Sequence, residues 1–284
     1  MSVDLHLHTH YSDGNWSPES LINRACELGF DTIAITDHDT TAALKESREL
    51  CANRIRLIDG IEFNTVAKNS AGKVKDIHIL GYFVDPLNSK LQEACERQRN
   101  ARIQQVEETV RIFQSKGHDI SLDDVTRQAG KGSIGRPHIC KAMLEKGITK
   151  EAQQAYRMLM NYDSEYRVER LSIHPEEAIA AIAAAGGVSS LAHPGKEIGI
   201  EMQIQQLREY GLNAVEVYHR SHTLSLIKKY LKIAAKNGLL ATGGSDCHGP
   251  YENFPGSIGS IRLAPDIVQR LEAFVADKRN RVTV

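Results

Sequence analysis

The chain has 284 residues, of which 41% are hydrophobic and 25% are charged, values that are typical of a soluble globular protein. Its formal net charge of -1 excludes a global field that would recruit nucleic acid or an anionic membrane, so an anionic substrate must be attracted by a local patch. No apolar run approaches the roughly 20 residues needed to span a bilayer, and we expect no membrane association.

The cysteines argue against a disulfide-stabilised protein. The chain has five of them, scattered and without a CxxC pair, which favours a reducing compartment and argues against a thiolate zinc site. The first residues, MSVDLHLH, lack the basic and apolar regions of a signal peptide. We therefore expect a cytoplasmic protein.

The first third of the chain alternates strand and helix patterns. The predicted strands cover residues 3–8, 31–36, 55–63 and 75–84, and the predicted helices cover residues 17–29 and 41–53. Ser17 is the expected cap of the first helix, with Pro18 at its first position and Gly29 after its end. A turn is expected at NSAGK, between the last two strands. This rhythm predicts βα units and a parallel sheet.

The rhythm stops near Leu91. Residues 91–117 form a long helical pattern with no strand on either side, and short helical patterns continue to about Met160. The alternation then resumes, with helices expected at 174–187, 200–211 and 224–238 and strands at 188–193, 214–218 and 239–246. We therefore predict an α/β body of residues 1–94 and 171–284 with a helical insertion at residues 95–170.

The first predicted strand carries two histidines, His6 and His8, on the same face. Two imidazoles on one face can share a metal ion. The alternative is a strand whose histidines face water or form hydrogen bonds in a core, and the pair alone leaves both interpretations open.

Further histidines and carboxylates lie at or near the ends of later predicted strands, where the side chains of an α/β barrel converge on one pocket. These are His38, Glu62, His78, His193, Asp246 and His248. Together with His6, His8 and Asp13 they make six histidines and three carboxylates, a set that suits manganese, zinc or iron. Nine ligands fit three ions if one carboxylate bridges two of them. Cys247 is left out, because its side chain would point away from its two neighbours.

The segments around these residues resemble one family. HLHTHYSDG, AITDHDT, GIEF, HILG, AHPG and GSDCH are similar to the motifs of the PHP (polymerase and histidinol phosphatase) superfamily of metal-dependent phosphoesterases, and they follow in the same order from Asp4 to His248. The resemblance implies an α/β fold, a distorted (β/α)7 TIM-like barrel with a trinuclear metal centre on its carboxyl face. The three divalent ions would be manganese, with zinc and iron as the alternatives.

Carried over by motif, the resemblance assigns each ion its ligands. The first ion would be held by His6, His8, Glu62 and Asp246, the second by Glu62 as the bridge with His78 and His193, and the third by Asp13, His38 and His248. Asp246 and His193 are also expected to take part in catalysis.

Other polar residues near the motifs are less certain candidates. Asp37 and Asp39 flank His38 and are candidates to orient ligands, since metal-bound imidazoles usually need a partner. Glu216 ends a predicted strand and is a weaker candidate to approach the site. His10 has no assigned ligand role, and we expect it to be exposed, with a place behind the ligands as the alternative. Histidines without a motif are expected at the surface: His118, His174, His219 and His222.

Such a centre predicts phosphoester hydrolysis. Adjacent ions lower the pKa of a bridging water, and the resulting hydroxide attacks phosphorus in line while the ions hold the phosphoryl oxygens. The chain shows no Ser-His-Asp arrangement and no reactive cysteine that would favour another mechanism.

The insertion is expected to select the substrate. Arg99 and Arg102 are three apart and hence neighbours on one helical face, and Arg136 and His138 lie where a glycine-rich turn leads into a helix. Arginines with helix amino-terminal amides make a phosphate site. The alternative for these residues is a solvated basic helix, and spacing alone favours that alternative.

The layout resembles one branch of the superfamily. That branch removes the 3′-phosphate from nucleoside 3′,5′-bisphosphates, and some members trim short 5′-phosphorylated RNA in the 5′–3′ direction. The resemblance thus implies a nucleotidase or exoribonuclease whose insertion grips the 5′-phosphate, with a nucleotide or short single-stranded RNA as its partner and no obligate protein partner. The branch often reads AHPGR, whereas Lys196 stands here, which keeps the charge but not a bidentate fork.

Two other functions stay open. Histidinol-phosphate phosphatase belongs to the same superfamily, but the insertion has no dedicated acidic set for an imidazole and an amine. A non-catalytic module that binds metal or nucleotide is opposed by the complete ligand set and by the short stretch of chain after His248. Release of phosphate by the metal-loaded protein would separate the enzymes from the binding module.

Overall fold

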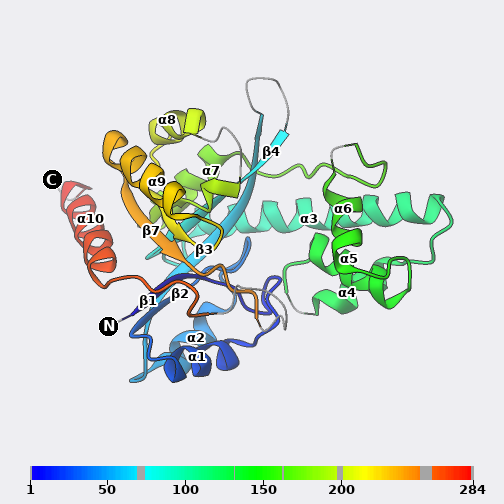
Figure 1. Ribbon diagram of the computed structural model, residues 1–284, viewed down its shortest axis with the longest axis horizontal. Coiled ribbons are helices and arrows are strands. Elements are labelled where there is room, and N and C mark those ends of the chain that lie inside the picture. The colour runs from blue at the N-terminus through cyan, green and yellow to red at the C-terminus, as the bar shows by residue number, and fades with distance from the viewer. Residues whose placement is uncertain are drawn as a thin grey trace.

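The computed structural model describes residues 2–68, 74–130, 132–161, 163–196, 201–249 and 258–282. Seven strands form one sheet in sequence order, shown in Figure 1: β1 (Val3–Leu7), β2 (Thr32–Ile35), β3 (Arg56–Lys68), β4 (Val74–Tyr82), β5 (Val188–Leu191), β6 (Ala214–His219) and β7 (Leu240–Gly244). The sheet curls until β1 meets the segment after β7, where the His8 amide donates to the Cys247 carbonyl at 3.0 Å. The expected distorted (β/α)7 barrel is thereby confirmed.

One strand runs against the expected direction. β1, β2 and β3 are parallel and so are β5, β6 and β7, but β4 is antiparallel to both β3 and β5. The prediction of a purely parallel sheet is therefore wrong at β4. Residues 69–73, which join β3 to β4, are too few for a parallel crossover, which needs about a dozen residues. The turn expected at NSAGK lies outside the described residues.

Helices cover the outside of the barrel. They are α1 (Pro18–Glu27), α2 (Leu44–Cys51), α7 (Pro175–Ala184), α8 (Glu201–Glu209), α9 (Leu224–Asn237) and α10 (Asp266–Val282). The Ser17 side chain accepts a hydrogen bond from the Ser20 amide at 3.1 Å and Pro18 opens α1, so the predicted start of this helix is confirmed. Within the described part of the chain, no helix combines the length and apolarity required to cross a bilayer.

The helical insertion extends to one side of the barrel in Figure 1. It consists of the long α3 (Ser89–Ser115) together with α4 (Leu122–Ala129), α5 (Arg136–Glu145) and α6 (Ala152–Met160). α3 belongs to two cores: Leu91 and Ala94 pack in the barrel, whereas Val106, Val110 and Phe113 pack with α4, α5 and α6. The exact boundaries, 95 and 170, stay a prediction, and α3 begins six residues before the first of them.

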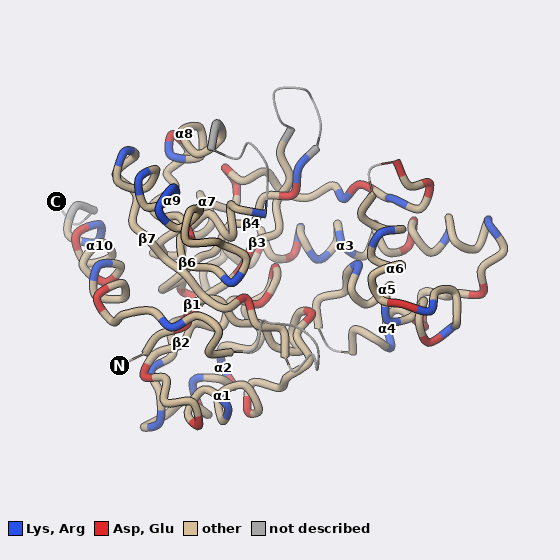
Figure 2. The backbone as a smooth tube through the Cα atoms, viewed as in Figure 1, with Lys and Arg blue, Asp and Glu red and all other residues tan. Residues whose placement is uncertain are grey.

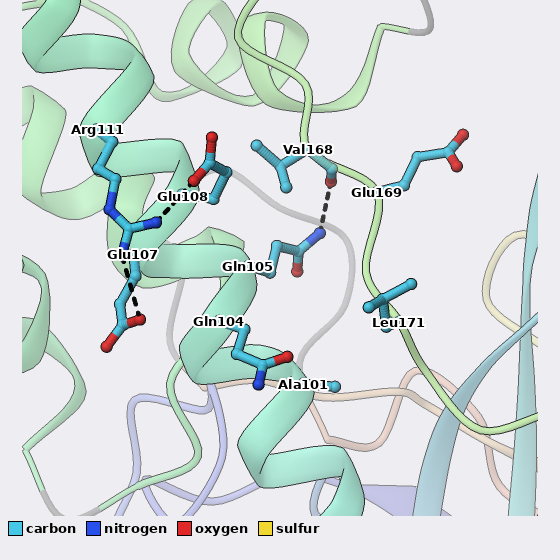
Figure 3. Close-up of a pocket in the computed structure, with 9 residues that line it drawn as sticks. All are labelled: Ala101, Gln104, Gln105, Glu107, Glu108, Arg111, Val168, Glu169 and Leu171. Carbon is cyan, nitrogen blue, oxygen red and sulfur yellow. Dashed lines mark hydrogen bonds and ion pairs between the residues drawn. The ribbon is translucent and has the colours of Figure 1, made fainter.

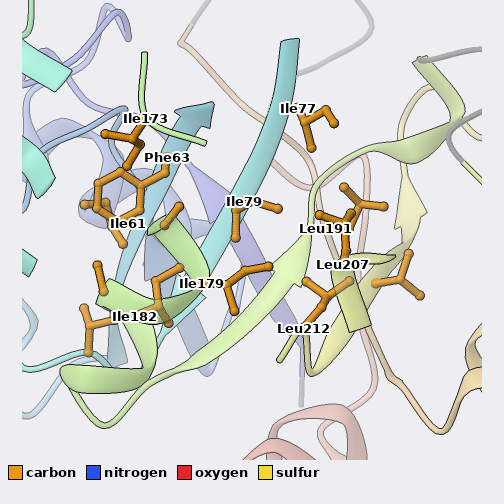
Figure 4. Packing of buried hydrophobic residues seen from close by; sticks show 14 of the residues in the cluster. Ile61, Phe63, Ile77, Ile79, Ile173, Ile179, Ile182, Leu191, Leu207 and Leu212 are labelled. Carbon is orange, nitrogen blue, oxygen red and sulfur yellow. The ribbon is translucent and has the colours of Figure 1, made fainter. Parts of the chain in front are cut away.

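The core beneath β3 and β4 gives the site a rigid base. Figure 4 shows Phe63 of β3 and Ile79 of β4 facing Ile179 and Ile182 of α7 in one apolar cluster, and all four are almost completely buried. Because alternate residues of a strand point to opposite faces, this packing turns the neighbouring Glu62 and His78 toward the interior of the barrel.

Candidate metal centre

His6 lies in β1 and His8 directly follows its end, and both are completely buried. Their side chains lie on one face of the strand. Each Nε2 lies 3.2 Å from Oε2 of Glu62, which comes from β3. Gly244 of β7 permits this arrangement, because a Cβ at that position would meet the Cβ of His6 at 2.4 Å. The expectation that the two histidines share a face and point into the barrel agrees with the structure.

Glu62 lies at the centre of the cluster. Its Oε2 is 3.0 Å from Nδ1 of His38, and its Oε1 is 2.9 Å from Nδ1 of His78 and 3.1 Å from Nε2 of His193. His78 reaches this place because β4 is antiparallel, so that the first half of β4 lies beside the end of β3. One carboxylate thus contacts imidazoles from four other segments of the chain.

Asp246 and Asp13 complete the cluster. Oδ1 of Asp246 lies 3.5 Å from Nε2 of His6 and 3.4 Å from Nε2 of His8. Asp13 lies 3.2 Å from Nε2 of His248 and 3.8 Å from Nε2 of His38. All nine residues singled out in the sequence therefore meet in one place.

The buried atoms of this cluster fit metal ligation. Among the described residues, several buried nitrogen and oxygen atoms of the cluster have no hydrogen-bond partner, including Nε2 of His6, Nε2 of His8, Nδ1 of His38, Oε2 of Glu62 and Oδ1 of Asp13. An unpaired buried polar atom is costly, and bound cations would satisfy these atoms. Ligand atoms about 2.0 to 2.2 Å from one ion are separated by roughly 3 to 3.5 Å, which matches the contacts above.

Among the described residues, three overlapping groups have the composition of a metal site, with the ligand atoms of each group within 4.8 Å of one another. They are His8, Asp13, His38 and His248; His6, His8 and Asp246; and His38, Glu62 and His78. His8 and His38 each occur in two groups, whereas the family resemblance gave each of them one ion. His193 belongs to none of these groups but contacts Glu62. A metal centre thus fits the residues, while the number of ions and the partition of ligands belong to the proposal below.

Burial and close contacts perturb the pKa values of the cluster strongly. Burial acts to raise the pKa values of Glu62, Asp13 and Asp246, but neighbouring histidines, and Lys196 beside Asp246, hold all three well below their usual range. Burial lowers the pKa of His38 and His193 to about 3, so these two imidazoles keep free lone pairs. Ionised carboxylates beside neutral imidazoles are the electrostatic environment that divalent cations require.

The backbone is strained at three residues of the site. Asp39, His193 and Asp246 have positive φ angles of 57°, 29° and 53°, which non-glycine residues rarely adopt. Each of these residues follows a strand of the barrel. The positive φ angle turns the backbone sharply there and directs the side chain over the ends of the strands.

Asp37 and Asp39, the aspartates that flank His38, form hydrogen bonds with a nearby loop and with an arginine of the insertion, and not with an imidazole. Asp37 accepts hydrogen bonds from the Thr9 amide at 2.7 Å and the Ser12 hydroxyl at 2.6 Å, which holds the loop that carries Asp13. Asp39 accepts from Nε of Arg102 at 2.6 Å. The suggestion that these two carboxylates orient ligand imidazoles is therefore not what the contacts show.

The insertion meets the barrel through buried arginines. Arg102 and Arg170 both lie close to Asp39, at 2.5 and 3.9 Å, and Arg136 pairs with Asp76 at 3.3 Å. We call Arg102, Arg136 and Arg170 the arginine cluster. Burial and Arg102 lower the pKa of Arg170 to about 9, and its Nε has no hydrogen-bond partner among the described residues. Arg170 stands in no motif, and no pattern in the sequence singles it out.

The other two residues expected to bind substrate, Arg99 and His138, lie in different environments. Arg99 is 62% exposed and pairs with Glu96 at 3.6 Å, so it does not share the buried environment of Arg102, although the two lie on one helix. His138 is buried at the start of α5, where its Nδ1 accepts a hydrogen bond from the Gly135 amide at 3.1 Å. Burial lowers its pKa to about 4.

A second group of cationic side chains lies over Asp246. Oδ2 of Asp246 lies 2.8 Å from Nζ of Lys196, 3.7 Å from the guanidinium of Arg220 and 3.3 Å from Nε2 of His219. His219 and His222 are buried, so their expected surface positions are wrong. The tight turn after β6 draws both inward, which residue type alone does not reveal. His10 is exposed, as expected.

Among the described residues outside these two groups, many basic side chains pair with acidic ones. Figure 2 shows basic and acidic residues interspersed over the barrel and the insertion. The pocket in Figure 3 lies between α3 and residues 168–171, and it sets Arg111 against Glu107, Glu108 and Glu169. Arg111 is already paired with Glu108 at 2.8 Å, so this pocket does not favour an anion.

Comparison with known proteins agrees with this geometry. A model of the PHP domain family matches residues 4–165. The 3′,5′-nucleoside bisphosphate phosphatase of Chromobacterium violaceum is 29% identical over 257 residues, 88% of this chain and 88% of that protein. The 5′-3′ exoribonuclease Rnm of Escherichia coli is 31% identical over 257 residues, 87% of this chain and 85% of that protein.

Two further similarities extend the comparison. The phosphoribosyl 1,2-cyclic phosphate 1,2-diphosphodiesterase of Eggerthella lenta is 30% identical over 263 residues, 90% of this chain and 97% of that protein. A solved structure from Bifidobacterium adolescentis, described as a metal-dependent phosphoesterase, has 31% identity and a TM-score of 0.85 and covers 95% of both chains.

Proposed function

Because the chain belongs to the PHP domain family, whose fold and cluster of potential metal ligands it shares, it is a phosphoric ester hydrolase, and we propose that it removes the 3′-phosphate from nucleoside 3′,5′-bisphosphates. We extend the proposal to short single-stranded RNA with a 5′-phosphate, cleaved in the 5′–3′ direction. The similarity to the bisphosphate phosphatase and to the exoribonuclease supports both substrates.

The metal part of the proposal is a centre of three divalent ions, manganese foremost, with zinc or iron as substitutes. The ligands would be the nine residues of the cluster: His6, His8, Asp13, His38, Glu62, His78, His193, Asp246 and His248. Bound ions would lower the pKa of a water and stabilise the charge that develops on the phosphoryl oxygens. The protein's part is to hold its carboxylates ionised and to bring its imidazole nitrogens together in a buried, closely packed site.

One observation supports a substrate with two phosphates: the arginine cluster lies next to the metal centre. Asp39, which pairs with Arg102, follows His38 in sequence, and Asp76, which pairs with Arg136, precedes His78 by two residues. Three guanidinium groups share these two carboxylates, and an anionic phosphate would balance the remaining charge. We infer that the cluster holds the 5′-phosphate while the metal centre acts on the other phosphate, one nucleoside away.

The residues over Asp246 belong to the same proposal. Lys196 and Arg220 lie at the metal centre on Asp246 and would contact oxygens of the phosphate under attack. Asp246 and His193, which turn over the strand ends on strained backbone, are the residues we propose for catalysis. Arg102, Arg136 and His138 are proposed for substrate binding, whereas exposed Arg99 would contribute only by its charge.

A substrate panel tests the proposal. Protein loaded with manganese would be given adenosine 3′,5′-bisphosphate, adenosine 3′-monophosphate, and short RNA with and without a 5′-phosphate. We expect kcat/KM to fall about 100-fold or more without the 5′-phosphate, because remote binding energy is then lost from the transition state. Equal rates with and without the 5′-phosphate would contradict the proposal.

Two other substrates belong in the same panel. Phosphoribosyl 1,2-cyclic phosphate also carries two phosphate groups, and a relative that acts on it is similar over nearly its whole length. It is therefore the second candidate substrate. Histidinol phosphate carries one phosphate and no group for the arginine cluster, so we expect it to be poor. Turnover of either compound in preference to the bisphosphate would replace our choice.

A pair of variants locates the 5′-phosphate site. Arg136→Gln should reduce the preference for a 5′-phosphate, because it removes a guanidinium of the arginine cluster. Arg111→Gln, on the exposed face of α3, is the matched control and should leave that preference unchanged. An unchanged preference in Arg136→Gln would place the phosphate site elsewhere.

A further inference from the structure

Glu216 is a buried carboxylate of β6 that stands in no motif of the family. It is completely buried, and its two oxygens have different partners. Oε1 lies 2.9 Å from Nδ1 of His6, and Oε2 accepts a hydrogen bond from the backbone amide of His193 at 2.6 Å. One side chain thus connects two residues that contact Glu62, one from β1 and one from the end of β5.

The contact with His6 fixes which nitrogen faces the cluster. A carboxylate only accepts hydrogen bonds, so Nδ1 of His6 must carry a hydrogen and donate it. His6 bound to a metal ion as a neutral imidazole would then use the lone pair of Nε2, the atom that lies 3.2 Å from Glu62 and 3.5 Å from Asp246. A carboxylate behind an imidazole also increases its basicity as a ligand.

The contact with His193 supports a strained backbone. His193 has a φ of 29°, outside the conformations that a residue with a Cβ prefers. Such strain persists only where surrounding contacts over-determine it. The short hydrogen bond from its amide to Glu216 is one such contact, and the turned backbone brings Nε2 of His193 to 3.1 Å from Glu62.

We propose that Glu216 is a positioning residue that holds His6 and His193 in their metal-binding orientations at the same time. The proposal rests on the metal centre of the proposed function but not on its substrate. It requires two acceptors on one side chain, because the two donors approach different oxygens.

The variant Glu216→Gln tests the requirement for two acceptors. Glutamine has the same shape but offers one acceptor and an NH2 group, so one of the two donors must face another donor. We expect the Kd for Mn²⁺, measured by calorimetry on the metal-free protein, to rise about 10- to 100-fold, the usual cost of losing such a partner. Wild-type affinity and stoichiometry in Glu216→Gln would overturn the proposal.

A matched control separates positioning from general destabilisation. Ser190→Ala, on neighbouring β5, removes the buried hydrogen bond between the hydroxyls of Ser190 and Thr242, which are 2.8 Å apart, and leaves the residues of the cluster unchanged. It should lower the melting temperature and leave Mn²⁺ affinity unchanged. If both variants lose Mn²⁺ affinity equally, Glu216 acts only through stability and the proposal fails.

A measurement on the unaltered protein covers the case in which Glu216→Gln does not fold. In the protein loaded with diamagnetic Zn²⁺, ¹H–¹⁵N NMR of the imidazoles should show the His6 proton on Nδ1. A His6 ring without that proton would overturn the proposal. Neither readout depends on which phosphoester is cleaved, so a failure of the proposed substrate would leave the test of Glu216 intact.

Discussion

Among single residues, Glu62 has the most demanding surroundings. It is completely buried and contacts five imidazoles, those of His6, His8, His38, His78 and His193. Its ionised form is held by those groups even though burial acts to raise its pKa. Removing the partners of such a buried charge is costly, so the five imidazoles and Glu62 depend on one another.

Replacing Glu62 should therefore remove metal without changing the shape of the side chain. We expect Glu62→Gln to lose bound Mn²⁺ and to lower kcat/KM by about 10³-fold or more, since metal ions supply several kcal/mol of transition-state stabilisation. Elemental analysis and steady-state kinetics would measure the two effects. The exposed Glu151→Gln is the control. Full metal content in Glu62→Gln would remove Glu62 from the proposed ligands.

His138 gives a prediction for the pH dependence of stability. Burial lowers its pKa in the folded protein to about 4, against an ordinary value of 6.5. The unfolded chain therefore binds the proton more tightly, so this contribution to stability is complete above pH 6.5. It is lost as the pH falls toward 4, by up to about 3 kcal/mol. In denaturant titrations, His138→Gln should show a shallower loss of stability over this range, and an identical slope would contradict the prediction.

The nine candidate ligands could be found from sequence because each stands in a short motif at a strand end. Glu216, Arg170 and His219 could not be found with the same assurance, because their roles depend on neighbours far away in the chain. Glu216 contacts His6 across 210 positions, for example. Local patterns indicate which residues are buried but not which distant atoms they meet.

At the scale of elements, the antiparallel β4 decides the geometry of the site. The hydrophobic pattern identified a strand but not its direction, since both directions alternate with the same period. Its reversal brings His78 beside Glu62, and the five residues that join β3 to β4 are the sequence feature that could have predicted it.

The contact of β7 with β1 gives an element-level prediction. An alanine at Gly244 would place its Cβ 2.4 Å from both the Cβ and the amide nitrogen of His6, so the strands must separate. We expect Gly244→Ala to destabilise the fold by about 1 to 3 kcal/mol and to lower Mn²⁺ content. Urea titration and elemental analysis would measure both.

Gly147 provides the control for this variant. It has a φ of 68° with no atom within 4 Å of an added Cβ, so Gly147→Ala should cost about 1 to 2 kcal/mol of backbone strain and keep its metal. Equal metal content in the two variants would show that the approach of β7 to His6 does not position the ligand.

For the whole molecule, the metal centre joins most of the barrel strands and the loops that follow them. Ions that bind only the folded chain stabilise it by about 2.7 kcal/mol at a hundred times their Kd. We therefore expect a chelator to lower the melting temperature and added Mn²⁺ to restore it, as seen by calorimetry. In Glu62→Gln, added Mn²⁺ should change the melting temperature little. A change equal to that of the wild type would mean that Mn²⁺ stabilises the fold by binding at another site.

The overall architecture of the molecule could be predicted from the sequence. The strand–helix rhythm, its interruption near Leu91 and the ordered motifs predicted a barrel with a helical insertion. The sharing of α3 between two cores was not predicted, because one helical pattern does not reveal that its apolar face changes partners along its length. For the same reason, the helical pattern did not reveal that Arg99 is exposed and Arg102 is buried, although they lie three residues apart.

α3 is a single helix of 27 residues, about 40 Å long, with neither glycine nor proline inside it. Its first turns are fixed in the barrel and its last turns in the insertion, and Arg102 lies between them. A helix of this kind offers no ready point at which to bend. If the arginine cluster holds one phosphate and the metal centre the other, as we propose, a stiff helix sets the distance between them, so molecules whose phosphates are spaced too closely or too widely should be rejected.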